Sequence, residues 1–108
     1  MDTSGRAIGR VTAMASLLSN TTRARIVGEL LGGPRIVSDL VNALGEAQAT
    51  VSKQIGVLRE GGLLCCRTDG RCREYGLTDP EGAAAVLEAL RGLGEKAEET
   101  PRLGQTGG

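Results

Sequence analysis

The chain contains no histidine, tryptophan or phenylalanine, and Tyr75 is its only aromatic residue. Without histidine it can form no Ser-His-Asp triad, no histidine-ligated zinc site and no imidazole pH switch. Its core must therefore be built from Leu, Ile, Val, Ala and Met, and 17 glycines among 108 residues reduce the number of side chains that can fill it. A core this small favours dimerisation, because an interface buries further apolar surface.

Long hydrophobic runs are also missing. No apolar segment approaches the ~18–20 residues of a membrane helix, and the N-terminus has no signal-peptide pattern. We therefore expect a cytoplasmic protein with no membrane partner. Without a phosphate-binding loop or paired carboxylates, only the cysteines could act as nucleophiles, and no base accompanies them. We expect no enzymatic activity.

The charges balance overall, with 13 Lys and Arg against 13 Asp and Glu, but they are unevenly distributed. Through Thr78 there are ten Lys and Arg against seven Asp and Glu, and from Asp79 onward there are three against six. The positive excess of the first part suits a polyanionic partner such as DNA. A net charge of zero is nevertheless low for a DNA-binding domain, so a module that binds other proteins stays open as an alternative.

Helical spacing of apolar residues predicts three helices before residue 46. The first runs from about Arg6 to Leu18. The second follows Asn20, which is a suitable N-cap, and stops at a Gly-Gly-Pro sequence over residues 32–34. The third is short, with Ser38 as its candidate cap, and Gly45 can take the left-handed turn that ends it.

A fourth helix is predicted from about Gln48 to Glu60. Val51, Ile55 and Leu58 form its apolar face, which leaves a narrow polar strip on the opposite side. Gly61 and Gly62 follow it and can close it by adopting positive φ.

Two strand-like segments come next, at residues 63–67 and 72–77. Asp69-Gly70 lies between them and predicts a tight β-hairpin. Asp79, Pro80 and Glu81 then supply an N-cap, a proline at the first helical position and an early acidic residue for a last helix.

Two short helices joined by a tight turn predict a helix-turn-helix, and the hairpin after it predicts a wing. The expected fold is mainly α with a small β-hairpin, in the order α-α-α-α-β-β-α, over residues 6–95, with a flexible N-terminus at 1–5 and a disordered tail at 96–108. The fourth helix would enter the major groove, and arginines of the hairpin would reach phosphates or the minor groove. The candidate DNA-binding residues are Gln48, Thr50, Ser52, Lys53, Gln54, Arg67, Arg71 and Arg73.

From about Ser19 to Leu77 the chain resembles the ArsR/SmtB family of winged helix-turn-helix transcriptional regulators. The resemblance rests on residues 18–27, 37–40, 48–55 and 58–63, together with Gly70-Arg71 and Tyr75 in the wing. It implies a homodimer formed through the first and last helices, DNA reading by the fourth helix, and repression until an inducer binds.

Three features depart from the family pattern. Ala47 stands where the family often has Ser or Thr, and alanine cannot cap the fourth helix. The family's metal site on the last helix combines Asp, Glu and His, but only Asp79, Glu81 and Glu88 are present here. The family's thiolate site at the start of the third helix needs a cysteine near Val37, and there is none.

The remaining candidate sensing residues are Cys65, Cys66 and Cys72. An Asp69-Gly70 turn would place Arg67 opposite Cys72 and Cys65 diagonal to it, and a loop one residue longer would place Cys66 opposite Cys72. Such thiolates could bind arsenite, cadmium, zinc or cuprous copper, or nickel with further ligands. Oxidation of the thiols, or simple packing of cysteine as a small hydrophobe, are the alternatives.

The sequence thus predicts a dimeric regulator that binds a double-stranded operator with an imperfect palindrome. We expect a repressor whose inducer is a transition-metal ion or arsenite, bound by the three cysteines. Two alternatives stay open: a regulator that responds to thiol oxidation, and a winged-helix module that works with a protein co-regulator carrying the inducer site.

Overall fold

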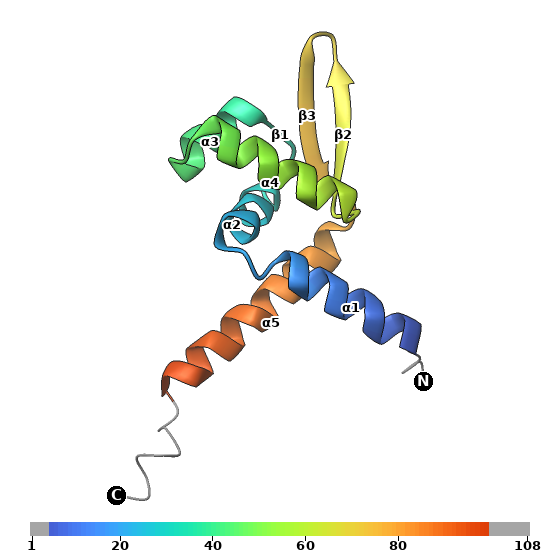
Figure 1. Cartoon of the computed structure of the whole chain (residues 1–108), viewed down its shortest axis with the longest axis vertical. Helices are drawn as coiled ribbons and strands as arrows, with labels where there is room; N and C mark the ends of the chain where they lie inside the picture. The colour runs from blue at the N-terminus through green and yellow to red at the C-terminus, as the bar shows by residue number, and fades with distance from the viewer. Residues whose placement is uncertain (1–4, 100–108) are drawn as a thin grey trace, which may run out of the picture.

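The computed structural model describes residues 5–99 as five helices and a three-stranded antiparallel sheet (Figure 1). In chain order the elements are α1 (Gly5–Leu17), α2 (Thr21–Leu30), β1 (Arg35–Ile36), α3 (Val37–Leu44), α4 (Gln48–Glu60), β2 (Leu64–Asp69), β3 (Cys72–Leu77) and α5 (Pro80–Glu99). The helix-turn-helix and the wing are therefore formed as predicted. Most of the predicted flexible ends lie outside these residues, but Gly5 already belongs to α1 and residues 96–99 belong to α5, so the folded unit is longer than residues 6–95.

Side-chain caps fix the starts of α2 and α5. The backbone N–H of Arg23 donates to Oδ1 of Asn20 at 3.0 Å, and that of Gly82 donates to Oδ1 of Asp79 at 3.0 Å. Both caps are those that the sequence predicts. Ser38, by contrast, is not a cap, because α3 begins one residue earlier and Ile36 precedes it with no side-chain hydrogen bond.

The hydrophobic core lies where α2, α3 and α4 meet the base of the sheet and the start of α5. Five of its side chains are less than 2% exposed: Ile26, Val27, Leu40, Val51 and Leu58. The rest of the buried set is Leu18, Leu30, Leu44, Ile55, Leu63, Leu64, Tyr75 and Ala83. All three residues of the predicted apolar face of α4 are therefore in the core.

The sheet contains one strand that the sequence did not indicate. The two residues of β1 pair antiparallel with β3, with Arg35 opposite Tyr75 and Ile36 opposite Glu74, which makes the strand order β1-β3-β2. Since α3 begins directly after β1, the base of the wing is hydrogen-bonded to the segment that enters the helix-turn-helix.

Figure 1 shows α1 and α5 crossing each other on the side of the molecule opposite the hairpin. Their inner faces pack partly against the core, through Met14 and Leu17 of α1 and Val86, Leu87 and Leu90 of α5. Within the part of the chain that the structure describes, no helix has the length and apolar character needed to cross a membrane.

Candidate nucleic-acid interface

The N-terminal half of α4 presents an exposed polar strip. Gln48, Thr50, Ser52 and Lys53 are all exposed, while Val51 between them is fully buried. Ala47, the N-cap, makes no side-chain hydrogen bond, as the sequence predicts, so no side-chain cap occupies the first-turn N–H groups of α4. Free amide donors and the positive end of the helix dipole favour a phosphate at this end.

Gln54 occupies a different place from the other candidates on α4. Its side chain is half-buried, and its Oε1 accepts a hydrogen bond from Nη1 of Arg23 on α2 at 2.9 Å. Successive side chains of an α-helix are rotated by about 100°, so Gln54 lies on the flank that faces α2 although Lys53 before it is on the exposed strip. A contact of Gln54 with DNA stays a prediction, and in the single chain its Oε1 is engaged by α2.

The turn between α3 and α4 is fastened to α2 by a carboxylate. The hydroxyl of Thr22 donates to both carboxylate oxygens of Glu46, at 2.9 and 3.1 Å. Arg25 contacts the same carboxylate at 3.4 Å and also donates to the carbonyl of Leu44 at 3.1 Å. Gly45, with φ of 70°, makes the left-handed turn that ends α3, as predicted. These bonds tie the end of α3 and the turn after it to α2, and no local pattern in the sequence indicates them.

The wing carries three exposed arginines, but its turn lies one residue later than predicted. Gly70 and Arg71 occupy the loop, and Asp69 pairs with Cys72. Positive φ occurs at Gly70 alone, at 64°, which is the pattern of a type II′ turn with glycine in its first central position. Arg71 therefore stands at the tip of the hairpin.

The other two arginines lie on opposite faces of the hairpin. Arg67 is opposite Glu74 and forms an ion pair with it, with Nη2 2.6 Å from Oε1. Arg73 is opposite Thr68, on the face that also carries Tyr75.

A cation–π contact joins α4 to the base of the wing. The guanidinium carbon of Arg59, in the last turn of α4, lies 5.9 Å from the centre of the Tyr75 ring, and Tyr75 itself is 7% exposed. The sequence places Tyr75 in the wing but indicates no role for Arg59, because only the fold brings the two residues together.

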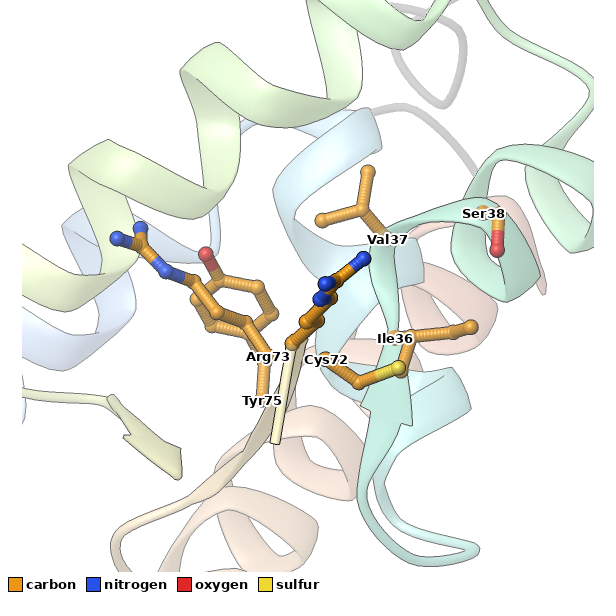
Figure 2. A pocket seen from close by; sticks show the side chains of 7 residues that line it. Ile36, Val37, Ser38, Cys72, Arg73 and Tyr75 are labelled. Atoms are coloured by element: carbon orange, nitrogen blue, oxygen red, sulfur yellow. The ribbon is translucent and has the colours of Figure 1, made fainter. Parts of the chain in front are cut away.

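A hollow of about 300 Å³ lies between β3 and the start of α3, and Figure 2 shows the side chains that line it. Ile36, Val37 and Ser38 line one side of it, and residues 71–73 and Tyr75 line the other. Arg71 and Arg73 place two cations beside this hollow.

The three cysteines do not converge. Cys65 is opposite Gly76, Cys66 is opposite Tyr75, and Cys72 is opposite Asp69, so the register is neither of the two that the sequence suggested. Cys65 and Cys72 do share a face of the hairpin, but three residue pairs lie between them along it. All three are free thiols. Among the residues that the structure describes, no three Cys, His, Asp or Glu side chains are grouped so as to hold a metal ion. The expected three-thiol metal site is thus absent from this part of the single chain.

The comparisons with known proteins agree with this geometry. A model described as a helix-turn-helix domain matches residues 18–67. The HTH-type transcriptional regulator NmtR of Mycobacterium tuberculosis is 35% identical over 85 residues, covering 79% of this chain and 71% of the relative. The arsenical resistance operon repressor of Escherichia coli is 38% identical over 88 residues, covering 76% and 74%.

A solved structure is also similar. The transcriptional repressor BigR of Xylella fastidiosa superposes with a TM-score of 0.73 at 32% identity, covering 82% of this chain and 89% of that one. The chain belongs to the ArsR/SmtB family of winged helix-turn-helix transcriptional regulators, which bind DNA and are not enzymes.

Proposed function

We propose that the protein is a repressor that binds its operator as a homodimer and releases it when an inducer binds. The observation that carries this proposal is the division of α4, which buries Val51, Ile55 and Leu58 and exposes Gln48, Ser52 and Lys53. A helix held by one face and polar on the other can enter a major groove without loss of its own packing. Thr50 is also exposed and lies on the flank of the same surface.

The wing supplies the second part of the proposed contact. Arg71 at the tip and Arg73 beside the hollow would neutralise phosphates next to the groove that α4 enters, or reach the minor groove. Arg67 is engaged by Glu74, so we assign it a smaller share of the phosphate contact.

Dimerisation through α1 and α5 is supported by the apolar side chains that these helices leave incompletely covered. Leu87 and Leu90 are only partly buried in the single chain, and Leu31 beside them is 41% exposed. Leu31 and Leu87 line a hollow of about 430 Å³ against which a second copy could pack. Two recognition helices in such a dimer would meet successive major grooves, about 34 Å apart, on an imperfect palindrome.

For the inducer we propose a metal ion or metalloid. The support is the E. coli relative, whose name connects it with arsenical resistance, and the presence of three free thiols in this chain. Soft ions such as arsenite or cadmium prefer thiolate ligands.

Thiol oxidation is the second candidate for the signal, and one observation favours it. Cys65 and Cys72 are exposed and lie apart, so each can react singly whereas joint chelation within one chain needs them close. Cys72→Ser tests whether either signal acts through this thiol. Because the thiol is exposed, its loss should spare the fold and DNA binding and should abolish release by the inducer.

The test is a fluorescence-anisotropy titration with DNA from upstream of the protein's own gene, at two salt concentrations. Each titration is repeated with arsenite, with Ni²⁺, Zn²⁺ or Cd²⁺, and with hydrogen peroxide. Salt-sensitive, sequence-preferring binding that a metal or arsenite weakens supports the proposal, and release by peroxide alone supports the second candidate. Binding that ignores salt would point to a protein co-regulator as the partner, since phosphate contacts make affinity fall with salt.

A further inference from the structure

Arg23 occupies a junction between three helices. It lies in the first turn of α2, where the Asn20 cap fixes its backbone N–H. Its Nε donates to the carbonyl of Leu17, the last residue of α1, at 2.6 Å. The final carbonyls of a helix have no partner within the helix, and a cation at that end also opposes the negative end of the dipole. Arg23 therefore caps the C-terminus of α1.

The same guanidinium reaches the recognition helix. Its Nη1 donates to Oε1 of Gln54 at 2.9 Å, across 31 residues of sequence. Arginine has only N–H donors, so the atom of the amide that it meets must be the oxygen. Gln54 therefore acts as an acceptor for Arg23, on the side of α4 that faces α2.

A second contact joins the end of α1 to the end of α4. The side chain of Leu17 lies so close to Gly61 that a Cβ on Gly61 would overlap its Cδ1 atom. The C-terminus of α1 thus meets α4 at two places, through Arg23 near the middle of α4 and through Leu17 at its last turn. Two separated contacts oppose rotation of one helix relative to the other.

We propose that Arg23 and Gln54 are positioning residues that set the half-site spacing of the operator. The inference rests on the proposed dimer through α1 and α5. In such a dimer α1 packs against the partner subunit. The hydrogen bonds from Arg23 to Leu17 and Gln54 then fix the position of α4 relative to α1, and so relative to the partner. This link determines the distance and angle between the two recognition helices, while neither side chain needs to touch DNA.

The experiment compares operators whose half-sites are moved apart or together by one base pair. Each base pair adds about 3.4 Å and about 34° of rotation between half-sites. Affinities are measured for each spacing and for an isolated half-site, with the wild type and with Arg23→Ala, Gln54→Leu and Gln54→Glu. The oligomeric state of every protein is determined by sedimentation.

Arg25→Ala is the matched control. Arg25 lies on the same helix and also donates to a carbonyl, but its bonds go to Glu46 and Leu44 within the helix-turn-helix and not to α1. A general loss of stability or of positive charge on α2 would affect both arginine variants alike.

We expect wild type to prefer one spacing by about tenfold or more over its neighbours, a factor that corresponds to about 1.4 kcal/mol. Arg23→Ala and Gln54→Leu should reduce that preference to about twofold, while half-site affinity changes little. Gln54→Glu keeps an acceptor for Arg23 and should retain the spacing preference, whereas Arg25→Ala should lower affinity at all spacings equally.

Three results would overturn the inference. Arg23→Ala could retain the full spacing preference in a dimer that binds the operator, which would leave the proposed function intact and remove the link. Gln54→Glu could abolish half-site binding, which would make Gln54 a direct DNA contact. A monomeric wild type would remove the dimer and, with it, the role of the link.

Discussion

In the helix-turn-helix, each exposed residue from Gln48 to Lys53 stands within one turn of a buried side chain of α4. In the wing, every described side chain from Arg67 to Arg73 is exposed, and the nearest buried residues are Leu64 and Tyr75 at its base. In the proposed complex both regions would offer polar and cationic side chains to DNA, but only α4 is held by core packing. We infer that α4 has the fixed geometry needed to read bases, whereas the wing contributes affinity through phosphates, for which position is less critical.

The largest expected difference between the regions is in stability. Leu58 is 0% exposed, so Leu58→Ala should lower the free energy of unfolding by about 3 kcal/mol, through lost transfer energy and a cavity. Urea denaturation measures this loss. Glu60→Ala is the control on the same helix, because Glu60 is exposed and its loss should cost less than about 1 kcal/mol. Equal losses for the two variants would show that α4 is not anchored by the core described here.

A second difference should appear in DNA binding. Gln48→Ala should reduce discrimination between operator and unrelated DNA by about 1–3 kcal/mol at one base pair, with little change in salt dependence. Arg71→Ala should instead weaken binding to every sequence and lower the salt slope by about 0.9. Anisotropy titrations at several salt concentrations distinguish the two. If Arg71→Ala alters the preference at one base pair and leaves the salt dependence of affinity unchanged, the wing reads sequence. The proposed difference between α4 and the wing would then be wrong.

The smallest expected effect concerns the start of α4. Ala47 has the extended backbone of an N-cap, with φ of −61° and ψ of 144°, but no side-chain acceptor. Ala47→Ser should stabilise the protein by about 1 kcal/mol, seen as a rise in thermal melting temperature. Ala49→Ser, two residues inside the helix on the exposed strip, is the control and should not stabilise. An unchanged melting temperature for Ala47→Ser would mean that water or another group already satisfies the first-turn amides.

Local signals in the sequence predicted most of the fold. The Asn20 and Asp79 caps, the left-handed Gly45 and the apolar face of α4 each depend on residues within one or two turns of chain, and the structure confirms all four. The candidate residues on the exposed strip of α4 could be found for the same reason, because helical periodicity fixes which side chains point away from the core.

Features that depend on distant residues were not predictable in this way. The two residues of β1 are too few for a strand pattern, and they are extended because β3 offers them partners. Asp69-Gly70 allowed the glycine to take either central position of the turn, and the position it takes moves Cys72 away from both other thiols. Helical periodicity places Gln54 on the surface of α4, but in the structure it accepts a hydrogen bond from Arg23, 31 positions earlier in the chain.

The direct succession of β1 and α3 also determines where this chain can change its length. Ile36 ends the strand and Val37 begins the helix, with no residue between them to absorb an insertion. An extra residue there would shift either the pairing with Tyr75 and Glu74 or the register of the helix against the core. The two-residue loop at Gly70 and Arg71, by contrast, forms the tip of the hairpin, which projects from the molecule (Figure 1). Relatives that vary the reach of the wing are therefore expected to lengthen it at the tip and to keep its base unchanged.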